Sequence, residues 1–353
     1  MTQKKLGFNE WFQAQLEDLP EGLVVARVIA VHKGECEVSD GETTAPAKMT
    51  GNLRHRAKSR MDYPTVGDWV LVKHFAEEAF DFGLIQSVLQ RKTALRRKTA
   101  GRTVRHQLIA ANIDTAFLMQ ALGPGFSLPR IERYLVMANE SGIDPIILLS
   151  KRDLLNPEEL KTVLFALQER IPNTPVYAFS NLSKEGLKEV QNLFLAGKTH
   201  CVVGTSGVGK TSLLNTMLDE DEERFTLPVR EKDGKGVHST TWRELIVLEN
   251  GALVVDTPGM RELGHLDAEE GIQETFDDIS ALAMHCRFND CAHVNTPGCA
   301  VLEAVECGEI PATRYQNFIR LMEESAILSQ AVLDQKGKNK ALRRFHKSMK
   351  NKG

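Results

Sequence analysis

The sequence lacks the long apolar segments that would place the chain in a membrane. No apolar run approaches the eighteen or so residues that are needed to span a bilayer. The first residues, MTQKKLGFNEWFQ, contain two lysines but no apolar stretch behind them, as a secretory signal peptide would require. We therefore expect a cytoplasmic protein with no membrane partner.

Cysteine is scarce, and we expect no disulfide bonds. The chain has six cysteines, and thiols stay reduced in the cytosol. Their spacing is therefore interpreted as metal binding or plain packing. The sequence also has no long internal repeat. Its 353 residues, of which 42% are hydrophobic and 26% charged, suit a soluble protein of about two or three domains.

Acidic residues are missing from two basic segments, although the net charge of the whole chain is −3. Residues 91–105 contain seven Lys or Arg and no acid, and residues 336–352 contain eight and no acid. Such clusters on an otherwise acidic chain favour a polyanionic partner such as a nucleic acid. A solvated surface and a disordered tail are the alternative interpretation.

The pattern of apolar and polar residues changes along the chain and suggests its division into domains. Residues 21–95 contain short strand-like runs rich in Val, Ile and Trp, which predict a small β-barrel. The oligonucleotide-binding (OB) type is our first choice, and an SH3-like barrel stays possible. Residues 105–265 alternate strands and helices, which predicts a mostly parallel sheet with helices on both faces. Residues 266–334 are mostly helical; residues 1–20 form an extension and residues 335–353 a basic tail.

Local signals in the alternating part predict particular elements. Asn156 followed by Pro157 is a typical helix start, with Asn156 as the cap. The pair Asn250-Gly251 predicts a tight turn between two strands. Residues 184–197, KEGLKEVQNLFLAG, predict one helix.

The strongest motif is GTSGVGKTS, which begins at Gly204 and fits the G-x-x-x-x-G-K-[ST] pattern. A strand-like THCVV precedes it and a helix-like SLLNTML follows it. Such a loop turns its backbone N–H groups toward phosphates, at the positive end of a helix. Lys210 should reach the β- and γ-phosphates, and the Thr211 hydroxyl should ligate Mg²⁺. The candidate residues of this phosphate-binding loop are Gly204, Thr205, Ser206, Gly207, Val208, Gly209, Lys210, Thr211 and Ser212.

Two further segments suit the hydrolysis of a nucleoside triphosphate. The string DTPG ends a strand, so that Asp256 could hold Mg²⁺ and the Gly259 N–H could face the γ-phosphate. Between this string and the phosphate-binding loop lies GVHSTTW, where a threonine should close onto Mg²⁺ and the γ-phosphate. Thr240 is our first choice for that threonine and Thr241 our second.

The string LLSKRDL, residues 148–154, is similar to the guanine-binding motif Asn-Lys-x-Asp of GTPases. The Asp153 carboxylate could accept hydrogen bonds from N1–H and the exocyclic amine of guanine, a donor pair that adenine lacks. The Lys151 stem would pack over the ring, and a backbone N–H near Asn181 would meet the guanine carbonyl. The candidate base-binding residues are Ser150, Lys151, Arg152, Asp153, Ser180 and Asn181.

This base motif precedes the phosphate-binding loop, whereas in an ordinary GTPase it follows that loop. The order is compatible with one site, because the loops after parallel strands gather at one edge of the sheet whatever their order in the chain. The sequence therefore predicts a circularly permuted GTPase domain.

Three cysteines and a histidine cluster in the helical part, with the spacing C-x4-C-x-H-x5-C. Three thiolates and one imidazole suit a closed tetrahedral Zn²⁺ site, and four protein ligands make such a zinc structural. Reduced cysteines in a core are the alternative. The candidate ligands are Cys286, Cys291, His293 and Cys299.

Together these motifs resemble the ribosome small-subunit-dependent GTPases of bacteria (RsgA type), over nearly the whole chain. The resemblance rests on the order SKRD, GTSGVGKTS, HSTT and DTPG, followed by the cysteine–histidine cluster. It implies a multidomain α/β protein with an OB-like barrel, a permuted P-loop GTPase domain and a zinc-binding helical domain. It also implies GTP and GDP as ligands, the small ribosomal subunit and its rRNA as partners, and hydrolysis stimulated by that subunit during late maturation.

The sequence departs from the family pattern at the base motif. Ser150 stands where the family has Asn, and Asn181 stands where it has Ala. Serine is shorter and lacks the amide that ties this loop to the phosphate-binding loop. We therefore expect guanine selectivity through Asp153, with a lower affinity.

The position after the DTPG glycine lacks the glutamine with which many small GTPases orient water. Met260 stands there, so we expect slow basal hydrolysis and a catalytic group from elsewhere in the chain. His238 is the candidate, because an imidazole can orient water or accept a proton. The alternative is that His238 only contacts RNA or solvent.

Three other functions stay open, and we expect a monomer in each case. A permuted GTPase could act on the large subunit, although the barrel and the zinc cluster argue against it. A P-loop nucleotide kinase with a zinc module would have no need of DTPG and SKRD around one pocket. An RNA-binding factor could use GTP as a structural ligand only.

Overall fold

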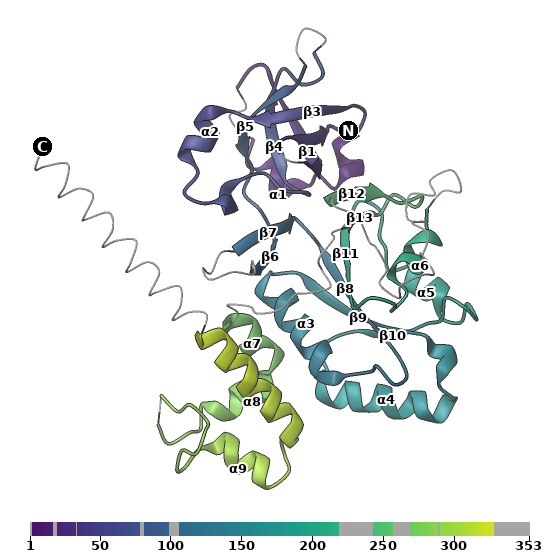
Figure 1. Cartoon of the computed structure of the whole chain (residues 1–353), viewed down its shortest axis with the longest axis vertical. Helices are drawn as coiled ribbons and strands as arrows, with labels where there is room; N and C mark the ends of the chain where they lie inside the picture. Colours follow the sequence, from purple (N-terminus) through teal and green to yellow (C-terminus); the bar gives the residue numbers. More distant parts are fainter. Residues whose placement is uncertain are drawn as a thin grey trace, which may run out of the picture. The chain divides into compact units, whose positions relative to one another are not determined.

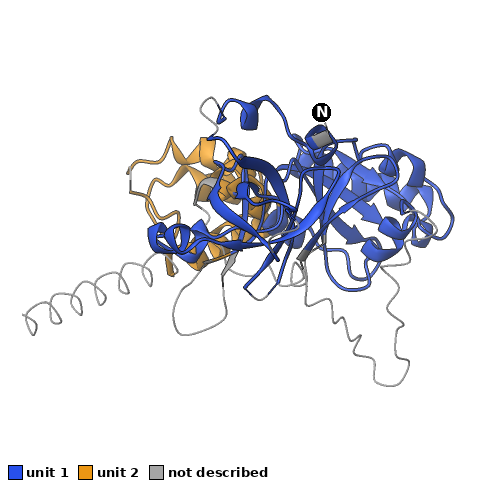
Figure 2. Ribbon diagram, turned by 90° about the horizontal axis from the view of Figure 1, so that it is seen from above, with its two compact units in different colours: residues 1–96, 108–134, 141–262 blue, residues 97–107, 135–140, 263–353 orange. Residues whose placement is uncertain are grey.

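The computed structural model describes most of the chain, namely residues 2–16, 20–32, 34–77, 81–98, 106–218, 243–256, 269–288 and 290–327. Contacts divide the chain into two compact units (Figure 2). The first unit comprises residues 1–96, 108–134 and 141–262, and the second comprises residues 97–107, 135–140 and 263–353. Among the described residues, no helix is long and apolar enough to cross a membrane.

A closed five-stranded barrel forms the first part of unit 1 (Figure 1). Its strands are β1 (Leu23–Val31), β2 (Cys36–Ser39), β3 (Thr44–Met49), β4 (Trp69–Lys73) and β5 (Gly83–Val88). They pair in the order β1-β2-β3-β5-β4, and β4 pairs with β1 to close the barrel. Buried Ala, Val and Ile side chains fill its interior. The predicted OB-like barrel is confirmed.

Strand β3 was not foreseen from the sequence. It reads TAPAKM, where Ala and Pro give no strand signal. Ala45 and Ala47 nevertheless face the interior while Thr44 and Pro46 are exposed, which is the alternation of a half-buried strand. After β3, Thr50 caps helix α2 (Gly51–Arg56) by accepting the N–H of Leu53. The remaining elements here are η1 (Thr2–Leu6), α1 (Glu10–Gln13) and η2 (Arg60–Asp62).

A mostly parallel sheet forms the second part of unit 1. Its strands are β8 (Thr115–Ala121), β9 (Asp144–Ser150), β10 (Val176–Ala178), β11 (Thr199–Val203), β12 (Arg243–Val247) and β13 (Leu253–Asp256). The order is β10-β9-β8-β11-β13-β12, and only β12 runs antiparallel to its neighbour β13. Strand β12 also pairs with β1, so that the barrel and this sheet are continuous. Two short strands, β6 (Ala94–Lys98) and β7 (His106–Ala111), pair separately.

Helices connect the parallel strands. They are α3 (Leu128–Glu140), α4 (Pro157–Arg170), α5 (Leu187–Gln191) and α6 (Lys210–Asn215), with the 3-10 turn η3 (Arg152–Leu154). Asn156 caps α4 as predicted, accepting N–H bonds from Glu158 and Glu159. Apolar residues of α5 and α6 pack with Phe117 and Met119 of β8.

The predicted helix over residues 184–197 is too long, because α5 covers only Leu187–Gln191. Gly186 precedes it with φ +70°, and a Cβ there would lie 2.2 Å from the carbonyl oxygen of Ala178. Only glycine fits there, and its left-handed backbone lies outside the α-helical region, so the helix begins after it. The tight turn at Asn250 and Gly251 is as predicted, with Gly251 at φ +79°.

A buried arginine joins three segments of unit 1. The Arg27 side chain comes from β1 and is 1% exposed. Its guanidinium donates to the carbonyl oxygens of Leu6, Gly67 and Asn112. Burial lowers the pKa of Arg27 from 12.5 to about 10, so that it stays charged at neutral pH. One cation therefore holds the N-terminal segment, the barrel and the start of the parallel sheet together.

Unit 2 is helical. It contains α7 (Glu269–Thr275), α8 (Asp277–Ala283), α9 (Ala300–Glu306) and a helix over residues 312–327. Apolar side chains from all four helices form one core, including Ile272, Phe276, Val301 and Phe318. Arg314 joins two of the helices through a two-pronged ion pair with Asp278, with N–O distances of 2.7 Å.

Replacing Arg27 should destabilise unit 1. Arg27→Leu keeps much of the volume but removes a buried donor from three carbonyl oxygens, of which Gly67 O keeps a second donor, the Asn112 amide. We therefore expect a loss of about 3–5 kcal/mol in the free energy of unfolding. Urea denaturation followed by circular dichroism measures this loss. Arg56→Leu, on the exposed end of α2, is the matched control and should change little. Equal midpoints for the two variants would contradict the role of Arg27.

Candidate functional site

The predicted nucleotide-binding segments lie at the carboxyl ends of neighbouring strands. Strand β9 ends at Ser150, β10 at Ala178, β11 at Val203 and β13 at Asp256. These strands are parallel to their neighbours in the sheet, so their ends share one edge. The chain leaves β8 toward β9 on one side and returns through β11 on the other, which makes this edge a topological switch point.

The phosphate-binding loop follows β11 and leads into α6. A Cβ on Gly204 would lie 2.3 Å from the Met119 carbonyl oxygen, so only glycine fits there. Gly209 has φ +95° and directly precedes the helix. The Lys210 ammonium donates to the carbonyl oxygens of Gly204 and Thr205, at 2.6 and 2.8 Å. The loop thus wraps around its own lysine at a helix N-terminus, which is the arrangement that binds phosphates.

The rest of the phosphate side is described only in part. Thr211 and Ser212 are exposed in the first turn of α6, where the Thr211 hydroxyl is available to a magnesium ion. Asp256 ends β13, next to β11. The remaining predicted residues of this side lie outside the described residues: His238, Thr240, Thr241, Gly259 and Met260.

The two base loops, residues 150–154 and 180–183, contact each other directly. Lys151 has a left-handed backbone with φ 57°, which turns the chain into η3. The exposed Asp153 carboxylate accepts a hydrogen bond from the Ser180 hydroxyl. The Ser180 oxygen in turn accepts the N–H groups of Leu182 and Ser183, each at 3.0 Å. Asp153 is therefore held in place while part of its carboxylate stays open to a base.

Arg152, also predicted to bind nucleotide, has a different partner. Its guanidinium forms an ion pair with Glu185 at 2.5 Å, and its backbone N–H donates to the carbonyl oxygen of Phe179. These contacts join the first base loop to the residues on both sides of the second, Phe179 before it and Glu185 after it. The described contacts of Arg152 thus position the loops.

The expected loss of a tie at Ser150 is wrong. The Ser150 side chain is 0% exposed, and its hydroxyl donates to the carbonyl oxygen of Val208 at 2.7 Å. Val208 belongs to the phosphate-binding loop, so serine keeps a link that we expected to need an asparagine amide. The register of β9 places Ser150 opposite Ala121 at the end of β8, close enough for its short side chain to reach this loop.

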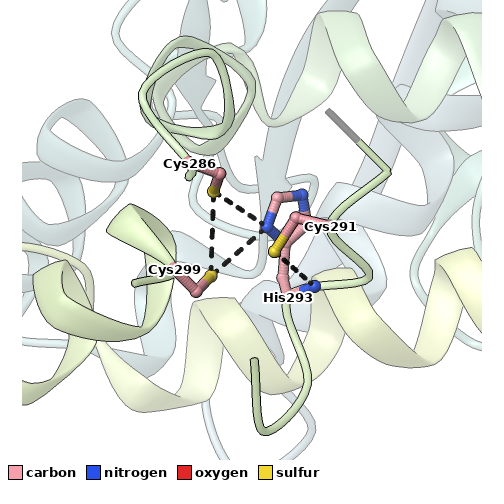
Figure 3. A group of neighbouring side chains, drawn as sticks. All are labelled: Cys286, Cys291, His293 and Cys299. Carbon is pink, nitrogen blue, oxygen red and sulfur yellow. Dashed lines mark hydrogen bonds between the residues drawn. The ribbon is translucent and has the colours of Figure 1, made fainter. Parts of the chain in front are cut away.

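The predicted zinc ligands converge in unit 2 (Figure 3). The Cys286 and Cys299 sulfurs are 3.8 Å apart, and the His293 Nδ1 lies 3.6 and 3.5 Å from them. The ligand atoms of all four residues, Cys291 included, lie within 4.8 Å of one another. Two sulfurs bound tetrahedrally at 2.3 Å from zinc would be about 3.8 Å apart. The four residues therefore fit a tetrahedral zinc ion.

The backbone around His293 is fixed for this geometry. His293 has φ 58°, and its N–H donates to the Cys291 sulfur at 3.4 Å. The Tyr315 hydroxyl donates to the His293 carbonyl oxygen at 2.8 Å. Burial lowers the pKa of His293 below its usual 6.5, which favours the neutral imidazole that metals bind. Burial also raises the pKa of Cys299 to about 11, so zinc must displace a proton there.

Sequence reasoning missed two supporting residues. Tyr315 binds the backbone of the predicted zinc ligand His293, but in the sequence it is only one aromatic residue in an amphipathic helix. Met119 lies against the phosphate-binding loop, but it stands within an apolar strand. In the sequence alone, both residues look like ordinary core residues.

Comparison with known proteins places these observations in one family. The RsgA GTPase family model matches residues 88–266. A "Small ribosomal subunit biogenesis GTPase RsgA 2" from Vibrio vulnificus is 37% identical over 348 residues, covering 98% of this chain and 94% of that relative. A "Small ribosomal subunit biogenesis GTPase RsgA" from Opitutus terrae is 37% identical over 341 residues, covering 94% and 92%.

Solved structures agree. YjeQ from Thermotoga maritima aligns with a TM-score of 0.63 at 29% identity, covering 86% of this chain and 99% of that one. YloQ, described as a circularly permuted GTPase, aligns with a TM-score of 0.61 at 25% identity, covering 88% and 97%. The predicted permuted fold and GTPase activity are therefore confirmed.

The Asp153 carboxylate should set the choice of base. Asp153→Asn replaces an acceptor by an amide, which pairs with the 2-oxygen of xanthine instead of the 2-amino group of guanine. We expect the variant to prefer XTP over GTP, by more than about tenfold in dissociation constants. Fluorescence titration with labelled GDP and XDP measures this change. The unmodified protein should bind ADP far more weakly than GDP, and equal affinities would contradict the assignment.

The zinc site predicts one metal ion for each chain. Cys299→Ser should lose this zinc. The backbone amides of unit 2 should then exchange with solvent faster, because the core of the unit packs against Cys299. Elemental analysis of the purified protein measures the metal, and hydrogen exchange over residues 269–327 measures the exposure. Cys307→Ser, an exposed cysteine outside the cluster, is the control and should keep its zinc. Metal-free unmodified protein, or zinc retained in Cys299→Ser, would refute the site.

Proposed function

We propose, because this chain belongs to the RsgA GTPase family, that it binds the small ribosomal subunit and hydrolyses GTP during the late maturation of that subunit. Two relatives that match nearly the whole chain are both named as small ribosomal subunit biogenesis GTPases. The observation that carries the proposal is the meeting of the base loops and the phosphate-binding loop at one edge of the sheet, in permuted chain order. The protein acts as a cytoplasmic monomer.

The proposed nucleotide site divides the work among separate loops. Asp153, held by Ser180, selects guanine, and the Lys151 stem covers the ring. Lys210 leaves its loop carbonyls to bind the β- and γ-phosphates, and the backbone N–H groups from Gly204 to Gly209 surround them. A magnesium ion bound between the phosphates, Thr211 and Asp256 would neutralise charge that develops during hydrolysis.

The catalytic step needs a group besides these residues. Met260 cannot orient water, so basal hydrolysis is slow. We assign the water-orienting role to His238 and the closing of the site to Thr240. We also assign to the Gly259 N–H the binding of the γ-phosphate. Subunit binding brings this segment into place, which makes hydrolysis depend on the partner.

The proposed partner surfaces are the two basic segments, the barrel and the zinc-binding domain. The basic residues 91–105 and 336–352 bind rRNA phosphates, together with the OB-like barrel. The zinc-binding domain, residues 266–334, holds one structural zinc in this proposal. The other proposed domains are the extension 1–20, the barrel 21–95, the GTPase domain 105–265 and the tail 335–353.

A rate comparison tests the proposed function. GTP hydrolysis is measured for the protein alone, with small subunits and with large subunits, at low and high salt. We expect small subunits alone to stimulate the rate by at least about tenfold, and salt to abolish the effect because it screens phosphate contacts. His238→Ala should bind GTP normally and lose the stimulation. No stimulation by small subunits would refute the partner, and full stimulation of His238→Ala would refute its catalytic role.

A further inference from the structure

Two side chains from different base loops hold the phosphate-binding loop. The Ser150 hydroxyl donates to the Val208 carbonyl oxygen at 2.7 Å. The Asn181 Nδ2 donates to the Gly209 carbonyl oxygen at 3.2 Å. These carbonyls belong to consecutive residues, directly before Lys210. The last turn of the phosphate-binding loop is therefore attached to both base loops.

The two attachments differ in their surroundings. Ser150 is fully buried, and the Val208 side chain is 4% exposed within the core below the loop. Asn181 is half-buried and approaches the loop from the second base loop. A Cβ on Gly209 would lie 2.8 Å from Asn181 Nδ2, so the amide lies directly against that glycine. The Asn181 attachment thus needs glycine at position 209.

The orientation of the Asn181 amide is fixed by its partner. A carbonyl oxygen can only accept, so the NH₂ end of the amide must face Gly209. The other end, Oδ1, is buried without a hydrogen-bond partner among the described residues. Leaving a buried oxygen unpaired costs stability. The Asn181 amide therefore makes its bond to Gly209 while its other end stays unpaired among the described residues.

These contacts form a continuous chain from Asp153 to the phosphate-binding loop. Asp153 accepts the Ser180 hydroxyl, and Asn181, the next residue, donates to Gly209. Any nucleotide that fixes Asp153 through its base would also fix the loop that bears Asn181. Holding a flexible binding loop in its bound shape before the ligand arrives lowers the entropy lost on binding.

We propose that Ser150 and Asn181 are positioning residues that together lock the phosphate-binding loop to the base loops, so that the loop is held in its binding shape before a nucleotide arrives. Asn181 supplies from the second base loop the amide that position 150 lacks. This assignment rests on the proposed binding of guanine nucleotides at the same site. It gives the two departures of this chain from the family pattern one shared role.

Loss of the lock should weaken diphosphate binding without changing base choice. We expect Asn181→Ala and Ser150→Ala each to weaken GDP binding by about 3- to 10-fold. Either remaining contact still holds the loop, so the double variant should lose more than the product of the single losses. The ratio of GDP to IDP affinity, which reports Asp153 and the exocyclic amine, should stay unchanged. Isothermal titration with GDP and IDP measures all of these values.

A measurement without nucleotide isolates the loop itself. Hydrogen exchange over residues 204–209 should be faster in both single variants than in the unmodified protein. Ser183→Ala lies on the same base loop with an exposed side chain, and it should change neither exchange nor affinity. Equal thermal unfolding midpoints for Asn181→Ala and Ser183→Ala would show that the fold is intact.

The outcomes separate this proposal from the proposed function. GDP affinity and loop exchange that stay unchanged in both single variants would refute the lock, while GDP binding itself would stand. A changed GDP-to-IDP ratio in Asn181→Ala would mean that Asn181 contacts the base, and would also refute it. Unmodified protein that fails to bind GDP would overturn the proposed function, and the lock with it.

Discussion

The parallel pairing of four strands is the constraint on which the candidate nucleotide site depends. Strands β9, β10, β11 and β13 run in the same direction in the sheet. Their carboxyl ends therefore share an edge, wherever each strand stands in the sequence. This explains how a chain with the base motif before its phosphate-binding loop builds the same kind of site as an unpermuted GTPase. The site requires that these strands be parallel, but it does not require a particular order of the strands in the chain.

Strand β12 extends this constraint to the barrel. It pairs with β13 on one side and with β1 on the other, while Arg27 of β1 binds three carbonyls from separate segments. The segment between α6 and β12 contains the proposed catalytic residues. Strand β12 therefore joins the end of that segment directly to the barrel.

Much of the site could be predicted because its signals are local. The phosphate-binding loop needs glycines where the backbone approaches Met119 or takes a positive φ, and such glycines are visible in a sequence. The metal ligands are visible as spacing. Ser150 was misjudged for the opposite reason, because its hydroxyl reaches Val208 across 58 sequence positions. No local pattern reports a contact of that separation.

The sequence by itself determined the chemistry: which residues can bind phosphate, select a base or ligate zinc, and the alternation that produces a parallel sheet. Tertiary structure alone decided which of these residues share support. Strand β3 was invisible as TAPAKM because its place depends on closing the barrel between β2 and β5. The link from Asn181 to Gly209 exists only once two strand ends meet. Composition fixes what a side chain can donate or accept, whereas only the folded backbone fixes the distance to its partner.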